Sequence, residues 1–316
     1  MAQPPAPGTR PVALVAGASR GLGLLIATDL AGRGHDVAIC SRDEQSLQQG
    51  RDQILRCVPE ARVHTMACDV ADEQQVRDLV DSTEQALGPV EVAIHVAGII
   101  QVGPWQASHH DHFEQAIDIM LWGPINLALA VVPRMTERGH GRFGVVTSIG
   151  GKVSPPRLLP YSTAKFGAVG FVEGLSAELA GTGVTATTIV PGLMRTGSHV
   201  QAKFFGDAAK QYAWFAPAAS LPLLSMDAHK AASKMVDGVL TGRPVALISP
   251  LSHIGTRVHG LAPNLTAHAM GLASRLLPKG SSSEVVDGRT ARERLSSPLV
   301  DRLTTLGDRA TRRHNE

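Results

Sequence analysis

Short runs of β-branched and apolar residues recur along the chain and are separated by longer segments with helical spacing. Because several of these runs are apolar at every position, they predict strands that are covered on both faces of a sheet. The intervening segments repeat apolar residues three and four positions apart, which is typical of helices with one buried face. The predicted strands are 12–16, 36–40, 63–67, 91–96, 143–148, 184–190 and 245–248, and the predicted helices are 21–33, 43–57, 72–87, 108–138 and 161–181.

This alternation predicts an α/β fold, a Rossmann-type doubly wound parallel sheet of seven strands with helices on both faces. A length of 316 residues would allow two domains on size alone, but the alternation continues unbroken to residue 249. We therefore expect a disordered N-terminus at 1–10 and one domain at 11–249, with a lid at about 193–227. An apolar helical appendage at 250–278 and a polar mobile tail at 279–316 are expected to follow.

The first predicted strand leads directly into a glycine-rich turn. Gly17, Gly21 and Gly23 lie between this strand and the first predicted helix. Glycines there allow a tight turn and close approach of a pyrophosphate, and the helix N-terminus offers free N–H groups to the anion. The placement indicates a dinucleotide site, although a tight turn without a ligand would show the same glycines.

The end of the second strand bears on which dinucleotide is bound. An acidic residue there would hold the ribose 2′-hydroxyl, but the sequence has Ser41 followed by Arg42, and Arg20 lies in the glycine loop. Two guanidinium groups suit a 2′-phosphate, so NADP(H) is favoured over NAD(H). The alternative is that both arginines are solvated surface residues.

Tyr161 and Lys165 are four positions apart in a predicted helix and therefore share one face. A free tyrosine has a pKa of about 10, and a cation within about 4–6 Å lowers it toward the range of a usable acid or base. Ser148 ends a predicted strand, where ligands bind in open α/β sheets, and its hydroxyl could donate to a substrate oxygen.

At this point the sequence resembles the short-chain dehydrogenase/reductase family. The matching pieces follow the family's order and spacing across about 11–249. They are AGASRGLG at 16–23, CDV at 68–70, HVAG at 95–98, Ser148, YSTAK at 161–165 and PGLMRT at 191–196.

The resemblance implies an enzyme that transfers hydride between a nicotinamide and a carbonyl or alcohol carbon. It implies that Tyr161 is the general acid/base, that Lys165 lowers its pKa and binds the nicotinamide ribose, and that Ser148 polarises the carbonyl. The implied cofactor contacts are Gly17, Ser19, Arg20, Gly21, Leu22 and Gly23 on the phosphates, Ser41 and Arg42 at the ribose, Asp69 and Val70 at the adenine, Ala97 and Gly98 beside the cofactor, and Pro191, Gly192 and Thr196 at the carboxamide. A homodimer or homotetramer, with contacts through 108–138 and 161–181, is also implied.

The sequence departs from the family pattern at four positions. Ala16, His95 and Val96 replace residues that are more common there, and Met120 occupies the slot of a catalytic Asn. A thioether cannot anchor a water chain as an amide can, and Asn126 lies about 240° further round the helix. Either the proton relay is rerouted through water, Lys165 or a backbone carbonyl, or the protein is a nucleotide-binding regulator with impaired catalysis. We favour the first.

Aromatic residues are scarce in this chain but gather in one place. Phe204, Phe205, Tyr212, Trp214 and Phe215 fall within 12 residues, where the family places its substrate lid. They predict an apolar lid over a hydrophobic carbonyl substrate. Ordinary packing of a helical hairpin, or a subunit contact, is the alternative.

Composition and charge exclude other classes. The net charge of +2 comes from residues 279–316, which carry 8 Lys/Arg against 6 Asp/Glu, so no clustered basic face indicates nucleic-acid binding. The cysteines lack zinc-site spacing and His253, His259 and His268 lack ligand spacing, so we expect no metal. With no secretory signal and no membrane span we expect a cytoplasmic protein. Residues 251–277 would cover a sheet edge, form an oligomer contact or lie on a membrane surface, in that order of preference.

Overall fold

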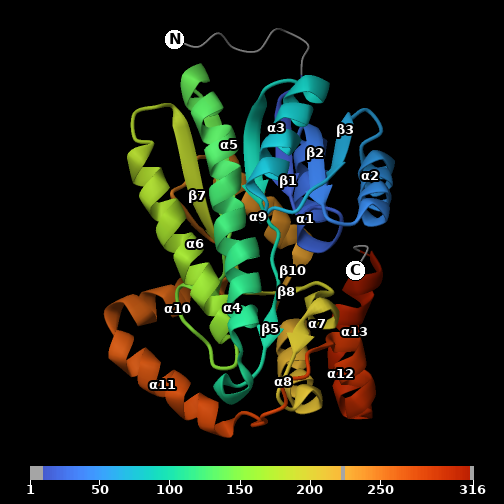
Figure 1. Ribbon diagram of the computed structural model, residues 1–316, viewed down its shortest axis with the longest axis vertical. Coiled ribbons are helices and arrows are strands. Elements are labelled where there is room, and N and C mark those ends of the chain that lie inside the picture. Colours follow the sequence, from blue (N-terminus) through green and yellow to red (C-terminus); the bar gives the residue numbers. More distant parts are fainter. Residues whose placement is uncertain (1–9, 222–224, 314–316) are drawn as a thin grey trace.

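The computed structural model describes residues 10–221 and 225–313, and its central element is a seven-stranded parallel sheet (Figure 1). The spatial order β11-β7-β6-β4-β1-β2-β3 confirms the predicted doubly wound fold. Each predicted strand is present within about two residues of its expected ends. The strands are β1 (Val12–Ala16), β2 (Asp36–Ser41), β3 (Val63–Ala67), β4 (Val90–His95), β6 (Gly141–Val146), β7 (Val184–Val190) and β11 (Val245–Leu247).

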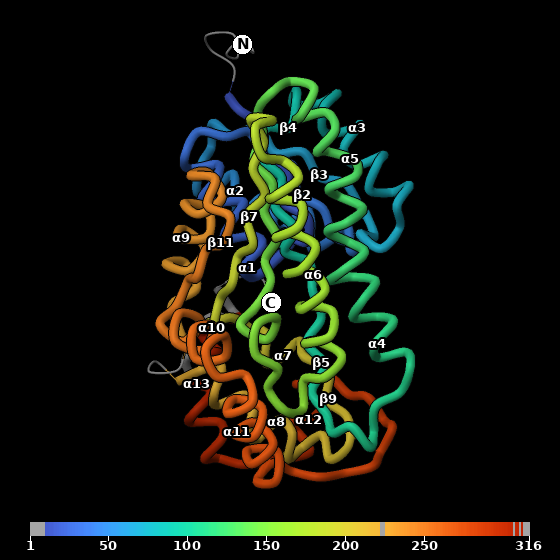
Figure 2. Tube along the Cα trace, turned by 90° about the vertical axis from the view of Figure 1, so that its left-hand side faces the viewer, coloured from blue at the N-terminus to red at the C-terminus, as the bar shows by residue number. Residues whose placement is uncertain are grey.

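Helices cover both faces of the sheet, and β1 shows why its sequence is apolar throughout. Alternate side chains of a strand point to opposite faces. Ala13 and Val15 therefore enter one core, while Val12 and Leu14 enter the other. Helices α1 (Gly21–Gly32), α2 (Glu44–Cys57) and α9 (Ala228–Leu240) cover the first face, and α3 (Glu73–Leu87), α5 (Gly123–Arg138) and α6 (Leu159–Glu178) cover the second (Figure 2).

The predicted helix 108–138 is divided into three parts. It consists of α4 (His110–Ile117), a π-helical turn at Asp118–Trp122, and α5. Among the described residues, 110–138 is the one helical stretch that is long and apolar enough to cross a membrane. More than half of its most apolar part is buried, so packing against the sheet accounts for its composition.

Smaller elements complete the molecule beyond the carboxyl ends of the main strands. One three-stranded sheet joins β5, β9 and β12, and a two-stranded sheet joins β8 and β10. These elements are β5 (Gln101–Val102), β8 (Leu193–Arg195), β9 (Lys203–Phe204), β10 (Ser225–Asp227) and β12 (Val286–Asp287), with 3₁₀ turns η1 (Trp105–Ala107) and η3 (Ile149–Gly151) and helices α7 (Ser198–Gln201) and α8 (Ala208–Ser220). Residues 222–224 of the expected lid lie outside the described residues.

Beyond residue 249 the chain forms two pairs of helices. These are α10 (Pro250–Leu261) with α11 (Pro263–Leu276), and α12 (Gly288–Leu295) with α13 (Pro298–Arg313). The tail differs from the mobile segment that we expected, because α12 and α13 pack beside α8 and bury Ala291 and Thr304 (Figure 1).

Of the N-terminal segment expected to be disordered, only Arg10 lies within the described residues. Its guanidinium is fixed on the body of the fold: it donates to the carbonyl of Ala31 at 2.9 Å and lies 3.3 Å from the carboxylate of Asp36.

Candidate active site

The glycine loop between β1 and α1 brings backbone segments into close approach. Gly17 and Gly21 have φ values of 87° and 56°, in the left-handed region that favours glycine. A Cβ on Gly17 would lie 2.5 Å from the amide nitrogen of Ala97, and one on Gly23 would lie 2.0 Å from the carbonyl oxygen of Gly17. No side chain caps the N-terminus of α1, so its N–H groups can receive an anion.

The structure brings Arg20 close to the end of β2. Hydrogen bonds from Ser46, followed by the charge of Arg20, hold the pKa of Asp43 below its ordinary value. The Ser41 hydroxyl donates to the carbonyl of Asp43 at 3.1 Å, and Arg42 is exposed beside it. Arg20 thus lies near the Asp43 carboxylate at the end of β2, and Arg42 precedes that carboxylate in the chain.

Ser148 and Tyr161 meet just beyond the carboxyl end of β6. Ser148 follows the strand and accepts a hydrogen bond from the amide of Gly150 at 3.0 Å, while α6 carries Tyr161. The two hydroxyls are hydrogen-bonded to each other. Burial raises the pKa of Tyr161, and the bond to Ser148 opposes that rise. Tyr161 is therefore a protonated acid at neutral pH.

Lys165, which the resemblance expects to lower the pKa of Tyr161, lies on the same helix one turn further along. Its Nζ donates to the carbonyl of Val146 at 2.8 Å and lies 5.9 Å from the centre of the Tyr161 ring. Burial lowers the pKa of Lys165 to about 7. The i,i+4 spacing does place both residues on one face, and the ammonium binds the carbonyl at the strand end; burial is what raises the pKa of Tyr161.

Met120 fills the slot of the family's asparagine, within the π-helical turn. It is buried and packs with Ala116, Ala164 and the ring of Tyr161. Asn126 is engaged elsewhere, because its Nδ2 donates to the carbonyl of Val70 at 3.0 Å. An apolar thioether therefore occupies this slot, and the nearby amide of Asn126 is bound elsewhere.

His95 is a residue to which the sequence analysis assigned no role. It ends β4, is fully buried, and neither ring nitrogen has a hydrogen-bond partner within residues 10–221 and 225–313. Burial, and then the charge of Lys165, lower the pKa of His95 to about 3. A neutral imidazole thus lies near Lys165, and its departure from the family pattern was the signal that could have singled it out.

The remaining predicted cofactor residues lie on the loops that follow the strands. The amide of Ala97 donates to the carbonyl of Ala16 at 3.0 Å, which holds the turn after β4 beside the glycine loop. The carbonyl of Pro191 accepts from the amide of Ile149 at 2.8 Å and so ties the turn after β7 to the residue next to Ser148. The others keep their predicted positions along the chain: Ser19 and Leu22 in the glycine loop and helix, Asp69 and Val70 after β3, Gly98 after β4, and Gly192 and Thr196 after β7.

The aromatic cluster predicted to form a lid instead forms a small core. Phe204, Phe205, Tyr212 and Phe215 are each at most 5% exposed, and only Trp214 is half-buried. The rings of Phe204, Tyr212 and Phe215 pack edge to face, whereas Phe205 stacks on His112. The buried residues of this core are Val102, Ala202, Phe204, Ala208, Tyr212, Phe215, Ala216, and Ala291 and Val300 of the C-terminal helices. These contacts are those of ordinary side-chain packing, which was our alternative to a substrate lid.

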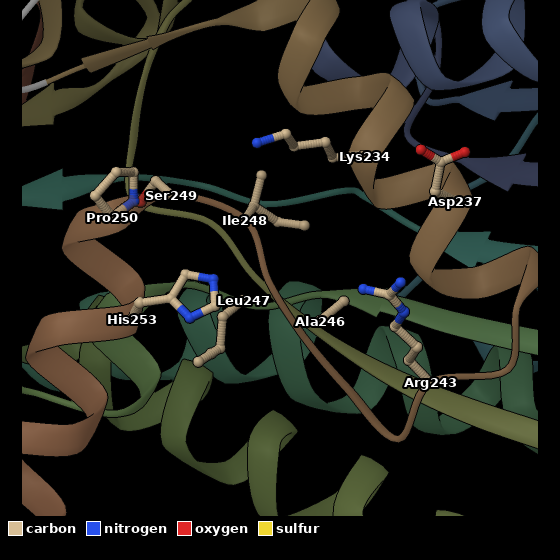
Figure 3. Close-up of a pocket in the computed structure, with 9 residues that line it drawn as sticks. All are labelled: Lys234, Asp237, Arg243, Ala246, Leu247, Ile248, Ser249, Pro250 and His253. Carbon is tan, nitrogen blue, oxygen red and sulfur yellow. The ribbon is translucent and has the colours of Figure 1, made fainter.

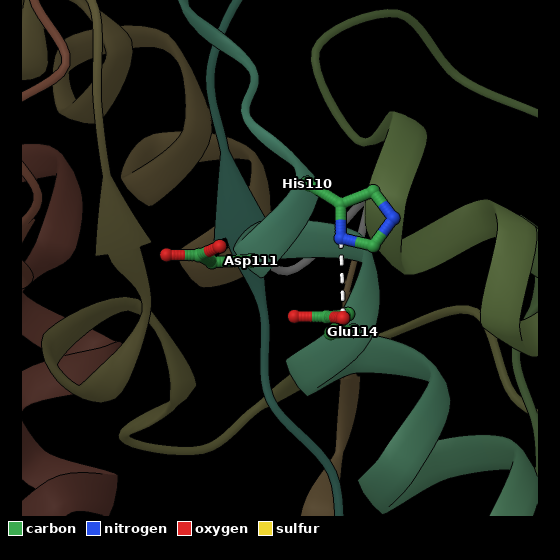
Figure 4. Close-up of side chains that lie close together, drawn as sticks. All are labelled: His110, Asp111 and Glu114. Carbon is green, nitrogen blue, oxygen red and sulfur yellow. Dashed lines mark ion pairs between the residues drawn. The ribbon is translucent and has the colours of Figure 1, made fainter.

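One group of side chains in the described residues has the chemistry of metal ligands. His110, Asp111 and Glu114 are all exposed at the start of α4. One ligand atom from each lies within 4.8 Å of the others, and His110 Nδ1 lies 3.1 Å from the Glu114 carboxylate (Figure 4). An ordinary i,i+4 ion pair accounts for this group.

The sequence model of the short chain dehydrogenase family matches residues 11–203. With the parallel sheet and the glycine loop already described, this match establishes that the chain belongs to the short-chain dehydrogenase family. It is therefore a dehydrogenase/reductase of a family that uses nicotinamide cofactors. The match ends before α8, so residues 204–316 are not part of it.

The chain is also similar to individual curated proteins. It is 34% identical over 181 residues to the 2-dehydro-3-deoxy-L-rhamnonate dehydrogenase (NAD(+)) of Sphingomonas, covering 57% of this chain and 70% of that protein. It is 32% identical over 189 residues to the glycine betaine reductase of Emericella nidulans, covering 60% of this chain but only 15% of that protein.

Among solved structures, the chain resembles actinorhodin polyketide ketoreductase with NADPH, at a TM-score of 0.64 and 26% identity. That match covers 78% of this chain and 92% of the ketoreductase. Levodione reductase has a TM-score of 0.67 at 23% identity, covering 78% and 98%, and supports the fold alone.

Proposed function

We propose that this protein reduces a hydrophobic ketone or aldehyde to an alcohol, or catalyses the reverse reaction, with NADP(H) as the cofactor. The observation that carries the proposal is the hydrogen-bonded pair Ser148–Tyr161 at the carboxyl end of the sheet, with Lys165 directly beneath it. The likeness to a ketoreductase with NADPH supports the same reaction class.

The glycine loop fits a dinucleotide, because its backbone has no room for side chains and the N-terminus of α1 is uncapped. The phosphates would lie against Gly17, Gly21 and Gly23, and the exposed Arg20 and Arg42 would hold a 2′-phosphate. When bound, the cofactor supplies or accepts the hydride.

In carbonyl reduction, Ser148 donates a hydrogen bond to the substrate oxygen and Tyr161 donates its proton to the same oxygen. Burial, which raises the pKa of Tyr161, keeps the phenol protonated at neutral pH, so the proton to be donated is present. Lys165, with a pKa of about 7, can exchange a proton near neutrality and so restore the proton of Tyr161. The carbonyl of Val146 accepts a hydrogen bond from Lys165 Nζ, so Lys165 is held beside Tyr161 without the missing asparagine.

The test is the decay of NADPH absorbance with a panel of carbonyl compounds, repeated with NADH. We expect Tyr161→Phe to lower kcat by about 10²–10⁴-fold, the usual contribution of a general acid. The chain has one other tyrosine, Tyr212, which is buried away from this site, so Tyr212→Phe is the matched control and should retain activity. Equal loss in both variants would contradict the assignment.

Met120→Asn separates the two interpretations of the altered relay. If the relay is rerouted, the variant should keep turnover within about tenfold, or about 1.4 kcal/mol of barrier. A much larger gain would show that the natural relay is broken. Cofactor binding without turnover of any carbonyl or alcohol would favour the regulatory alternative.

We also propose that the protein forms a homodimer or homotetramer. Trp122, Leu129 and Phe166 are large apolar side chains that are exposed on the helices predicted to make the subunit contact. Sedimentation of the purified chain tests this.

A further inference from the structure

Helices α10 and α11 form an arm along one edge of the molecule (Figures 1 and 2), and several of their large apolar side chains are exposed. Leu261 and Leu276 are 88% and 84% exposed, and no residue of α11 is buried. The exposed apolar set, which we call the arm stripe, consists of Leu251, Ile254, Val258, Leu261, Leu265, Leu272 and Leu276. Its members recur at intervals of three, four and seven residues, so within each helix they lie on one face.

The arm is fixed to the body of the fold by its other face. Ser249 and Ser252 form a capping box at the start of α10, with 3.2 Å between the Ser252 amide nitrogen and Ser249 Oγ. Gly255 lies close enough to Ile149 that an added Cβ would approach it to 3.0 Å. Arg157 donates to the carbonyls of Ser274 and Leu277 at 3.3 and 3.2 Å. The stripe is therefore held outward by specific contacts.

The charge around the arm has one sign. Residues 238–283 contain no Asp or Glu, but they contain Arg243, Arg257, Arg275 and Lys279. On each helix polar side chains lie beside the stripe. His253 and Arg257 on α10 are about 80–120° round the helix from it, and His268 and Arg275 on α11 are about 60–80° from it.

A hollow with basic groups adjoins the start of α10 (Figure 3). Its volume is 380 Å³, and Lys234, Arg243 and His253 line it. Asp237 also lines it, but Arg33 binds its carboxylate at 2.6 Å. The cationic side chains thus continue from the flank of the stripe into a concave surface of about the size of a small polar group.

We expected residues 251–277 to cover a sheet edge, form an oligomer contact or lie on a membrane surface, and the first two do not fit these observations. Cover for a sheet edge would bury the stripe, and α11 buries nothing. A second copy of the arm would bring cations against cations, with no carboxylate within residues 238–283 to pair with them.

We propose that the arm binds the surface of an anionic lipid membrane, with the arm stripe in the acyl boundary and the flanking cations at the headgroups. A helix with an apolar face beside a basic face is the form that lies in a membrane interface, and anionic lipids attract the cations. This proposal is independent of the reaction catalysed.

Flotation of the full-length protein with vesicles tests the proposal. Vesicles of phosphatidylcholine mixed with phosphatidylglycerol should carry the protein, whereas phosphatidylcholine alone should carry much less of it. Leu265→Ser with Leu272→Ser should lower the partition coefficient by at least about tenfold, because each leucine buried in lipid contributes that order. Leu299→Ser is the matched control, since Leu299 on α13 is equally exposed (67%, as Leu265 is) but lies outside the arm.

A second pair of variants tests the charge. Arg275→Gln with Lys279→Gln should weaken binding to the anionic vesicles about fivefold for each cation removed, and added salt should do the same. Arg302→Gln, an exposed cation of α13, should change nothing.

Two results would overturn the proposal. One is equal flotation with both kinds of vesicle, or with neither. The other is a halved mass of the leucine double variant in sedimentation without lipid, which would show that the stripe binds a second copy. Unchanged melting temperatures would show that each variant is folded.

Discussion

The two helical pairs that follow residue 249 both pack in a way that their amino-acid composition would not suggest. The pair α10–α11 is rich in leucine yet leaves its apolar stripe exposed. The pair α12–α13 is polar yet packs on α8 and completes a core. From composition alone, α10–α11 would be the packed pair and α12–α13 the exposed one. Our expectation of a mobile tail at 279–316 rested on composition in this way.

A network of ion pairs helps to pack the polar pair α12–α13 into the fold. Arg292 on α12 binds both oxygens of Asp308 at 3.0 Å and one oxygen of Asp301 at 2.7 Å. Asp308 also lies 3.1 Å from Nε2 of His199, which is fully buried. This network, together with a few small apolar side chains, fastens a polar segment, and α11 has no equivalent among the described residues.

The largest expected effect comes from removing the centre of this network. Arg292→Gln leaves the carboxylates of Asp301 and Asp308 without their guanidinium, so we expect the free energy of unfolding to fall by about 2 kcal/mol. Arg275→Gln, on the exposed face of α11, should change it by less than about 0.5 kcal/mol. Denaturant melts of both variants provide the measurement, and equal losses would remove the distinction between the two pairs.

Two glycines offer a smaller but well-matched comparison. A methyl group on Gly307 of α13 would lie 2.7 Å from His199 Cε1 and Ser220 Oγ, whereas one on Gly271 of α11 would meet nothing within 4 Å. Gly307→Ala should destabilise the protein by about 1 kcal/mol through overpacking. Gly271→Ala should stabilise it by up to about 1 kcal/mol through helix propensity. A gain in both melting temperatures would mean that α13 is not packed as described.

The smallest effect is expected from pH. Burial lowers the pKa of His199. The charge of Arg292 lowers it further, whereas the hydrogen bond and charge of Asp308 act in the opposite direction. The unfolded chain therefore binds the proton more readily than the folded one, and the stability that neutral His199 contributes is lost as pH falls below about 6.5. Hydrogen exchange in α13 should become faster at pH 5 than at pH 7, and His199→Gln should reduce that difference. Exchange in α11 serves as the internal control.

The sequence predicted the sheet well because its signals are local. A run such as VALVA at 12–16 is apolar at each position only if both faces are covered, and the glycines at 17, 21 and 23 mark the turn by themselves. The positions of Ser148, Tyr161 and Lys165 followed from spacing in the same way.

What the sequence could not predict depends on where side chains point in three dimensions. Lys165 shares a helix face with Tyr161, but its ammonium binds the carbonyl of Val146, which comes from a strand 19 residues earlier. Tyr212 and its aromatic neighbours pack with Ala291 and Val300, which lie at least 76 residues further along the chain. No local pattern reports contacts of that range.

The small sheet formed by β5, β9 and β12 has a consequence for synthesis. β9 lies in the middle and joins Gln101–Val102 on one side to Val286–Asp287 on the other. At about 5–20 residues per second, a ribosome needs roughly 10–40 s to make the chain between these outer strands. The main sheet can assemble during that interval, but Phe204 and Tyr212 must wait for the helices that bury them. The nascent protein therefore exposes an aromatic surface until α12 and α13 have been made. We expect it to depend most on chaperones during this period.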